Sequence, residues 1–407
     1  MNRSFLRYLG PGLLITVGFI DPGNWAANVA AGAQYGYTLL WMVTLSTLML
    51  ILLQHNAAHL GIATGLCLAE AANRYLPPWL SRPILGSAMV AAVSTALAEI
   101  LGGALALNML FGLPLRGAAA LVAVMAAVFL YTNSYRRVEK LIIGFVSLIG
   151  LSFLFELWLA QPDWGATARG LVLPAFPPGA MPIIMGVLGA VVMPHNLFLH
   201  SEIIQSRHWD RTDEATIRHQ MRYELFDTLV SMFIGWGING AMIVLAAATF
   251  FQAGQPVTEL GQAAAMLAPI AGRAAALVFA LGLLFAGVSS SITAGLAGGS
   301  ICAGLVGREY DSRGRSSRLG TGLTLGLGLA GILFLLRDPF QGLILSQILL
   351  AIQLPVTVIT QIRLTSSRKV MGVHANSGPE QAALWIVAAT VIVLNLLLLA
   401  SFFTRPG

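Results

Sequence analysis

Apolar residues along this chain fall into long runs in which polar residues are rare, instead of the strict alternation expected of half-buried strands. A helix of about 20 apolar residues is long enough to cross the hydrocarbon core of a bilayer. The pattern therefore predicts an all-α membrane protein with eleven transmembrane helices. The predicted spans are 8–33, 37–62, 84–111, 115–132, 141–160, 180–204, 226–252, 270–304, 319–336, 340–362 and 381–403.

Basic residues are distributed unevenly between the loops that join these spans. Of the 23 Lys and Arg residues, 18 lie on the side that carries the amino terminus. The other side carries Arg116, Arg169, Arg273, Arg337 and Arg405. Because cytoplasmic loops are enriched in Lys and Arg, the amino terminus is predicted to be cytoplasmic and the carboxy terminus external. The same distribution explains the net charge of +6 without a nucleic-acid partner.

The composition agrees with a membrane protein. Hydrophobic residues make up 57% of the 407 residues and charged residues 10%, whereas about a quarter of a soluble domain is charged. Cys67 and Cys302 are far apart and show no metal-ligand spacing with a second Cys or His, so neither a disulfide nor a structural zinc site is predicted. We expect a single transmembrane unit over 1–407, monomeric, embedded in the lipid bilayer and without a resident cofactor.

The first span is interrupted at its centre by Asp21-Pro22-Gly23-Asn24. Pro22 removes a backbone donor and Gly23 admits almost any backbone conformation, so the helix is expected to break there. Non-helical backbone at this depth persists only where it is buried in protein or lines a cavity. Asp21 is the one residue in 8–33 with a formal charge, which makes it a candidate ligand.

The sixth span contains a matching interruption, Met193-Pro194-His195-Asn196. Proline and asparagine recur at the same spacing, and Met193 stands where Asp21 stands in the first motif. Paired interruptions in two halves of a membrane protein point to a substrate site between inverted repeats. We therefore expect Asp21, Asn24 and Met193 to converge on one ligand. The expected repeats of five spans are 8–160 and 180–362, with 381–403 as an additional helix.

A carboxylate, an amide oxygen and a thioether indicate the kind of ion that would bind. Mg²⁺ and Ca²⁺ take oxygen ligands, whereas the softer sulfur of Met193 favours Mn²⁺, Fe²⁺, Co²⁺ and Cd²⁺. Backbone carbonyls freed by the breaks, at Gly18 and Ala190 if the three-residue offset holds, would complete the shell. The ordinary alternative for Met193 is a side chain that only fills the core.

Further ionisable residues lie within the predicted spans. Glu99 is costly to bury and is a functional candidate, with a protonated structural glutamate as the alternative. His195 titrates near neutral pH and suits a proton route, with a hydrogen-bonded core histidine as the alternative. His55 and His59 lie four residues apart on one helical face and are predicted to be solvated near the cytoplasmic end rather than to bind metal.

The two motifs together resemble the paired signature of the Nramp family of divalent-metal transporters, in its bacterial manganese-transporter branch. The resemblance continues in family order through Gly32 to Tyr37, Leu97-Ala98-Glu99, Leu197 to Ser201, Ser346-Gln347, Gln353-Leu354-Pro355 and 365–372. It implies a leucine-transporter-type fold with broken helices 1 and 6, and import of Mn²⁺ or Fe²⁺ with protons across the bacterial inner membrane. It assigns metal ligation to Asp21, Asn24, Met193, the Ala190 carbonyl and, in some states, Gln347. It assigns the proton pathway to Asp21, Glu99, His195 and Arg318.

The chain departs from the family pattern at three positions. Ala96 stands where an aspartate usually precedes Leu97-Ala98-Glu99, Ser317 replaces an arginine before Arg318, and Val288 replaces a glutamine. The aspartate missing at position 96 belongs to the proton pathway that the resemblance implies. We therefore expect metal transport to persist with loosened or rerouted proton coupling.

Two other functions fit parts of the pattern. A Mg²⁺ carrier on the same fold is disfavoured by the thioether of Met193. An intramembrane metalloenzyme would need a motif such as HExxH or a histidine-rich site, and the sequence contains neither. We expect a transporter and not an enzyme.

Overall fold

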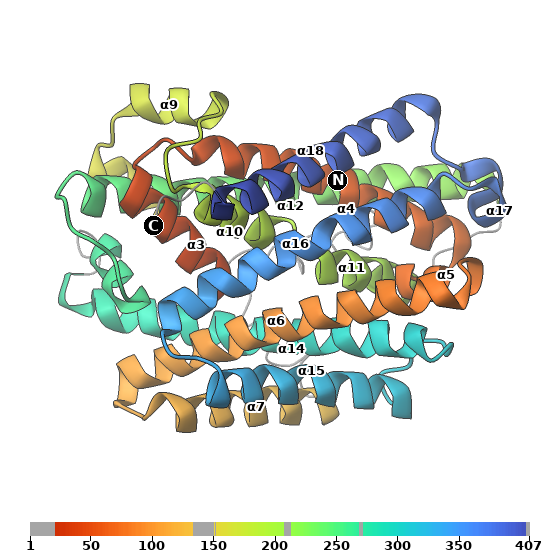
Figure 1. Cartoon of the computed structure of the whole chain (residues 1–407), viewed down its shortest axis with the longest axis horizontal. Coiled ribbons are helices and arrows are strands. Elements are labelled where there is room, and N and C mark those ends of the chain that lie inside the picture. Colours follow the sequence, from red (N-terminus) through yellow and green to blue (C-terminus); the bar gives the residue numbers. More distant parts are fainter. Residues whose placement is uncertain (1–20, 133–149, 151, 207–212, 268–271, 404–407) are drawn as a thin grey trace.

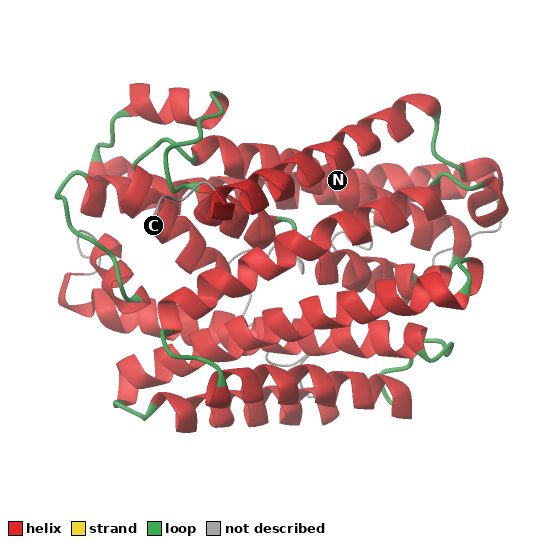
Figure 2. Ribbon diagram, viewed as in Figure 1, coloured by secondary structure: helices red, strands yellow, loops and turns green. Residues whose placement is uncertain are grey.

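The computed structural model describes residues 21–132, 150, 152–206, 213–267 and 272–403 (Figure 1). In these residues every regular element is a helix and no β-strand occurs (Figure 2), which confirms the predicted all-α class. Eight of the described helical segments are long and apolar enough to cross a bilayer. The total of eleven stays a prediction, because parts of the predicted spans 8–33 and 141–160 lie outside the described residues.

The longer helices follow one another along the chain. They are α3 (Pro22–Tyr35), α4 (Leu40–Thr64), α6 (Pro78–Phe111), α7 (Leu115–Tyr131), α10 (Met181–Val191), α11 (Pro194–Ser206), α12 (Glu214–Ala246), α14 (Ala275–Leu305), α15 (Arg315–Phe334), α16 (Pro339–Thr365) and α18 (Gly378–Phe403). The shorter elements are α5 (Leu68–Tyr75), α9 (Trp164–Val172), η1 (Ala247–Phe251), η2 (Leu260–Leu267), η3 (Gly272–Ala274), α17 (Arg368–Met371) and η4 (Gly372–His374).

Most boundaries lie within a few residues of the predicted spans, and α12 is the clearest difference. It begins at Glu214, whereas the apolar pattern predicts a span at 226–252. Asp213 caps this helix by accepting the backbone N–H of Thr216. Because the charged first turns continue the same helix beyond the apolar part, hydropathy finds the membrane-embedded section and misses the start of the helix.

The helices run roughly along the long axis of the molecule, which is horizontal in Figure 1, and form two groups. α6, α7, α14 and α15 lie in the lower half of this view, and α14 packs most extensively against α6. α3, α4, α10, α12 and α18 lie in the upper half. α16 packs on α10 and also on α6, so it joins the two groups.

Glycine allows helix backbones to touch at a few positions in this arrangement. A Cβ atom at Gly287 of α14 would overlap the backbone of Gly103 in α6, and one at Gly189 of α10 would overlap the carbonyl of Gln347 in α16. Small residues at helix contacts permit this close approach in membrane proteins. The contact at Gly189 holds α10 and α16 together beside the second interrupted motif.

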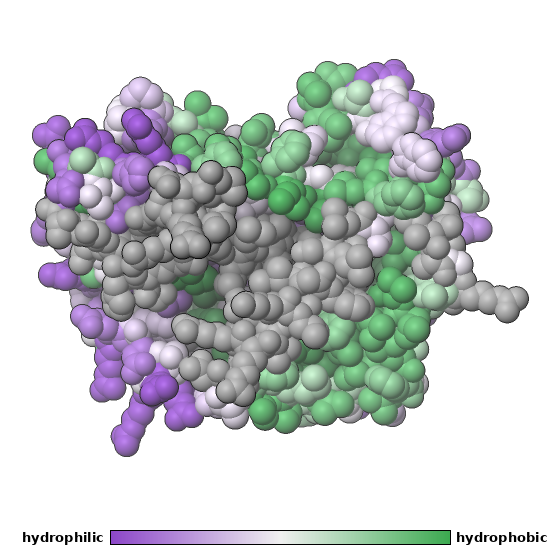
Figure 3. Space-filling view, turned by 180° about the vertical axis from the view of Figure 1, so that it is seen from behind, coloured by the Kyte–Doolittle hydropathy of each residue, from purple (hydrophilic) through white to green (hydrophobic). Residues whose placement is uncertain are grey.

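Large apolar side chains remain exposed on the outside of the helices. On α18, Ile386 is 67% exposed, Leu396 59% and Phe403 88%. Figure 3, which views the molecule from behind, shows hydrophobic residues in the upper middle and at the lower right, and hydrophilic residues at the left-hand end and at the upper right. Apolar side chains on the outer faces of long apolar helices are typical of contact with lipid, and the chain is a multi-pass membrane protein.

Candidate metal-binding site

Asp21 caps α3, which begins inside the first interrupted motif. The residues before Asp21 lie outside the described ones, so the break in the first span stays a prediction. The backbone at Asp21 is extended (φ −90°, ψ 161°), and α3 begins at Pro22. The Asp21 carboxylate accepts the backbone N–H of Asn24 at 2.7 Å and the side-chain amide of Asn24 at 3.1 Å. Proline at the first helical position needs no donor, and aspartate is a preferred N-cap. The motif therefore starts a helix and holds a buried carboxylate at its tip.

The second break lies between α10 and α11. α10 ends at Val191 and α11 begins at Pro194, so Val192 and Met193 belong to neither helix. The carbonyl of Ala190, at the end of α10, accepts a hydrogen bond from the Asn24 side chain at 2.9 Å. This bond joins the two breaks across 166 residues of sequence.

Gln347 reaches the same place from α16. Its amide lies directly over Gly23, where a Cβ atom would overlap it and would also come within 3.2 Å of the Asp21 carboxylate. The amide nitrogen of Gln347 donates to the Ser346 hydroxyl at 3.2 Å, and the side chain is buried. The absence of a side chain at Gly23 makes room for the Gln347 amide.

Two buried amide oxygens at this point, Asn24 Oδ1 and Gln347 Oε1, have no hydrogen-bond partner among the described residues. The orientation of the Asn24 amide is fixed because its nitrogen already donates to two acceptors, Asp21 and Ala190. A buried acceptor left unpaired costs about 1–3 kcal/mol. Together with the Asp21 carboxylate and the Ala190 carbonyl, these oxygens form an oxygen-rich set that suits a cation.

Met193 is buried at the second break, with an exposed fraction of 2%. It packs with Ala91 of α6 and Leu350 of α16, so its side chain is not turned toward lipid. Its sulfur accepts a hydrogen bond from the Asn196 amide at 3.2 Å. Among the described residues no hydrogen bond joins this sulfur to Asp21 or Asn24. Because the Asn196 amide already donates to the sulfur, a metal bound at Asp21 and Asn24 would compete with Asn196 for it.

The donor set at the breaks differs from that of a conventional metal centre. In the part of the chain that the structure describes, no three His, Cys, Asp or Glu side chains lie together as a metal site. A metal at the breaks would therefore depend on amide, carbonyl and thioether donors beside one carboxylate. Gly18, the other carbonyl ligand that the sequence predicts, lies outside the described residues.

Glu99 of α6 lies close to this site. Neither of its carboxylate oxygens has a hydrogen-bond partner among the described residues, and the Ser290 hydroxyl is a polar neighbour outside hydrogen-bonding geometry. Asp21 is near enough for the two negative charges to repel each other. Burying two neighbouring carboxylates without a cation partner is costly, so a proton or a cation must balance their charge.

His195 and Ala96 bear on the predicted proton pathway. His195 Nδ1 lies 3.0 Å from the hydroxyl of Thr95 in α6, so the imidazole is buried and hydrogen-bonded. Ala96, the next residue, lies against Gly328 of α15. Position 96 therefore faces α15. An aspartate at this position, as in the family pattern, would place a carboxylate against α15, whereas this chain has a methyl group there.

Arg318 lies apart from Glu99 and His195. Its exposed guanidinium stacks on the ring of Tyr131 at 5.0 Å, and the Tyr131 hydroxyl donates to the Arg318 carbonyl at 3.1 Å. Arg318 precedes Gly328 by ten residues on α15, a distance of about 15 Å along the helix. The structure therefore brings Glu99 and His195 close to the breaks and places Arg318 nearer the start of α15.

A polar network that the sequence did not reveal lies between α4, α11 and α12. Glu224 is buried and pairs with His55 at 2.6 Å and with His200 at 3.4 Å, and it accepts the Thr228 hydroxyl at 2.7 Å. The prediction that His55 and His59 are both solvated is wrong for His59, which is buried, whereas His55 is partly exposed and also binds this carboxylate. The signal in the sequence was a carboxylate two residues before the predicted span 226–252.

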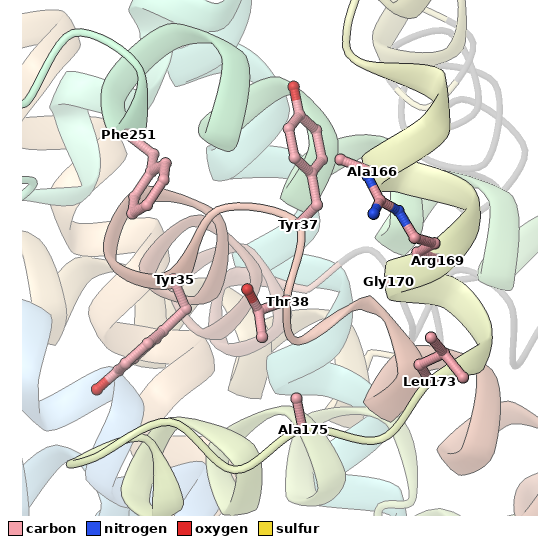
Figure 4. Close-up of a pocket in the computed structure, with 9 residues that line it drawn as sticks. All are labelled: Tyr35, Tyr37, Thr38, Ala166, Arg169, Gly170, Leu173, Ala175 and Phe251. Carbon is pink, nitrogen blue, oxygen red and sulfur yellow. The ribbon is translucent and has the colours of Figure 1, made fainter.

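A separate pocket of about 350 Å³ lies at the surface, between the turn after α3, α9 and η1. Figure 4 shows its lining, including Tyr35, Tyr37, Arg169 and Phe251. Arg169 is exposed, and no residue of either interrupted motif lines the pocket. It is therefore not part of the candidate metal site.

Comparison with solved structures defines the class of the protein. Mhp1, a nucleobase-cation-symport-1 family transporter, matches with a TM-score of 0.64 and 16% identity over 97% of this chain and 92% of its own. This match shows the fold, which is of the leucine-transporter type, as the sequence predicts. The Eremococcus coleocola manganese transporter matches with a TM-score of 0.79 and 28% identity over 100% of this chain and 90% of its own.

The family follows from the sequence comparisons. The family model described as natural resistance-associated macrophage protein-like, Nramp, matches residues 12–401. The divalent metal cation transporters MntH of Brucella suis and Ralstonia nicotianae are 38% and 39% identical to this chain, over 99% and 97% of its length and 90% of theirs. The chain belongs to the Nramp family. Because these relatives are transporters, the alternative of an intramembrane metalloenzyme is excluded.

Proposed function

We propose that this chain imports divalent transition-metal ions, Mn²⁺ and Fe²⁺ and also Co²⁺ and Cd²⁺, across the bacterial inner membrane. The observation that carries the proposal is the unpaired Asn24 oxygen, buried beside the Asp21 carboxylate and the Ala190 carbonyl. A buried acceptor without a donor is satisfied when a cation binds. The names of the relatives, divalent metal cation transporter and manganese transporter, support the same substrate class.

Discrimination against Mg²⁺ and Ca²⁺ is assigned to Met193. Its buried sulfur would leave Asn196 and take a transition metal at the Asp21–Asn24 pair. A thioether contributes little to the binding of hard ions. Gln347 and the Gly18 carbonyl would complete the shell.

Proton co-transport is assigned to Asp21, Glu99 and His195. Two carboxylates close together in a buried place favour uptake of a proton when the metal leaves. Ala96 removes one carboxylate from the pathway of the family, so coupling is proposed to be loosened. The exposed position of Arg318 supports a route that does not depend on it.

The topology is proposed from the charge distribution. The side of the membrane with 18 of the 23 basic residues would be cytoplasmic, with the amino terminus there and the carboxy terminus outside. The chain would act as a monomer, as one unit over 1–407 with repeats at 8–160 and 180–362.

The proposal is tested by Mn²⁺ binding and Mn²⁺ uptake into proteoliposomes with a matched pair of variants. Asp338 offers the control, because it also precedes a proline and caps its helix by accepting the N–H three residues on, yet it is exposed. Asp21→Asn should abolish saturable uptake and binding, whereas Asp338→Asn should leave both unchanged. Equal uptake by the two variants would show that Asp21 is not a metal ligand.

The selectivity claim is tested by Met193→Leu, which keeps the volume and removes the sulfur. Met185→Leu, in the buried part of α10, is the control. Competition of Mn²⁺ uptake by Ca²⁺ or Mg²⁺ should increase in the first variant alone. Unchanged selectivity in Met193→Leu would exclude the thioether as the discriminating ligand.

Proton coupling is tested by following the internal pH of the same liposomes during metal uptake. Loosened coupling predicts a proton-to-metal ratio that varies with the imposed pH gradient. A fixed stoichiometric ratio across gradients would contradict the loosened mechanism.

A further inference from the structure

Glu70 joins three segments at the end of the molecule that carries α5, the right-hand end in Figure 1. Its Oε2 accepts the side-chain amide of Gln205, near the end of α11, at 2.6 Å. Its Oε1 accepts the backbone N–H of Tyr310, in the loop between α14 and α15, at 3.0 Å. Oε2 also accepts the N–H of Cys67 at 3.3 Å and closes the first turn of α5. One carboxylate, 8% exposed, thus binds three parts of the chain.

Two further contacts hold α5 in the same position. The Leu68 N–H donates to the Ser201 hydroxyl of α11 at 2.8 Å, and that hydroxyl donates to the Phe198 carbonyl at 2.7 Å. On the other side, a Cβ atom at Gly304 of α14 would overlap Ala69 of α5. α5 is therefore bound to α11 on one side and to α14 on the other.

The two sides are α11, which packs on α4 of the upper group and also touches α14, and α14 of the lower group. α11 begins directly after Met193, at the second break, whereas α14 packs on α6 and α15 in the lower group of Figure 1. If α11 moves away from α14 at this end, either the bond from Gln205 or the bond from Tyr310 must break.

The bonds at Glu70 are strong but opposed by a neighbouring charge. Hydrogen bonds to a buried carboxylate are stronger than neutral ones. Glu202, on the next turn of α11 after Phe198, lies near enough to repel the Glu70 charge. This repulsion opposes the contact of α11 with α5.

We propose that Glu70 is a positioning residue for transport. With the Gln205 amide and the Tyr310 N–H it forms a latch that holds this end of the transporter closed and must release before an ion leaves the breaks toward this end. The inference rests on the proposed function, because release matters to transport only if an ion passes the breaks.

Hydrogen exchange of the full-length protein in nanodiscs, without metal, tests the latch independently of transport. The variants are Glu70→Ala, Gln205→Ala and the control Glu309→Ala, whose exposed carboxylate lines the same surface pocket as Glu70. Exchange in the peptide that contains Tyr310 should accelerate about tenfold or more in Glu70→Ala, which removes the acceptor of that N–H, as expected for loss of a charged hydrogen bond. Gln205→Ala leaves this bond in place, so it should accelerate exchange in the last turn of α11 and not at Tyr310, whereas Glu70→Ala should accelerate both. The control should exchange like the parent.

Mn²⁺ uptake by the same variants gives the second readout. Release of the latch shifts molecules toward the state that is open at this end, so the KM for ions offered from the other side should rise several-fold. Glu70→Gln, which keeps one acceptor oxygen, should give an intermediate KM. Unchanged exchange at Tyr310 in Glu70→Ala, unchanged exchange in the last turn of α11 in Gln205→Ala, or a KM equal to that of the control would overturn the latch. If the parent does not transport Mn²⁺, the proposed function fails, and the exchange result still decides whether Glu70 couples the two segments.

Discussion

Replacing Gly189 by alanine should separate the two helices that hold the site. A methyl group there overlaps the Gln347 carbonyl and approaches the Ala351 nitrogen of α16. Because these are backbone atoms, they cannot turn aside, and α10 has to move. Gly186 provides the matched control one turn earlier, since its Cβ would meet no atom closer than Ile344 at 3.6 Å.

The expected magnitudes follow from two opposing effects. Alanine in place of glycine stabilises a helix interior by about 1 kcal/mol. Overpacking costs about 1–3 kcal/mol, and backbone overlap belongs at the upper end. Gly186→Ala should raise the free energy of unfolding by about 1 kcal/mol. Gly189→Ala should lower it by up to about 2 kcal/mol net, so the free energies of unfolding of the two variants should differ by about 1–3 kcal/mol. Mn²⁺ affinity should fall about tenfold in Gly189→Ala if the shifted Ala190 carbonyl costs about 1.4 kcal/mol of binding.

Thermal unfolding in detergent and calorimetric Mn²⁺ binding measure both effects on the same two proteins. Gly186→Ala should unfold at or above the temperature of the parent and bind Mn²⁺ equally well. If Gly189→Ala matched it in both measurements, close packing of α10 on α16 would not position the site.

Three further predictions concern buried groups. Trp25→Ala should lower the free energy of unfolding by about 3–5 kcal/mol, because this buried ring packs on Phe279 with centroids 4.9 Å apart, and an unchanged unfolding midpoint would contradict it. His55→Ala should lower the free energy of unfolding by about 1.5–3 kcal/mol, because it removes a hydrogen bond to the buried Glu224 carboxylate of α12. His219→Ala, at an exposed position of α12, should lower it by less, and equal unfolding midpoints of the two variants would contradict this prediction. Burial raises the pKa of the Cys67 thiol to about 12, so the reactive thiolate is scarce at pH 7.5 and increases as the pH rises. Maleimide labelling followed by peptide mass spectrometry should therefore modify Cys67 only after unfolding, and rapid labelling of the folded protein would exclude this burial.

The two breaks could be predicted because proline and glycine interrupt long apolar runs twice with the same spacing. Asp21 and Asn24 were predicted as ligands for the same reason, since polar residues at membrane depth are rare. The matching motifs also predicted that the Ala190 carbonyl lies beside Asp21 and Asn24. The direct hydrogen bond from Asn24 to that carbonyl could not be predicted, because it depends on how α3 packs on α10.

Residues at the ends of the membrane spans were harder to interpret. The spacing of His55 and His59 indicates a helical face, but it does not show that α12 brings the Glu224 carboxylate to that face. Glu70 lies in a short polar segment that hydropathy treats as a loop, although it binds α11 and the α14–α15 loop. Polar residues in such segments take their roles from tertiary contacts rather than from their neighbours in sequence.

The most direct test is to locate a bound metal ion by anomalous scattering from crystals of the protein grown with Mn²⁺, with Asp21→Asn crystals as the comparison. We expect one strong peak within coordination distance of the Asp21 carboxylate, the Asn24 amide oxygen, the Ala190 carbonyl and the Met193 sulfur, and no such peak in the variant. A peak at another place, such as the Glu224 carboxylate, or a peak at the breaks that persists in Asp21→Asn, would contradict the account.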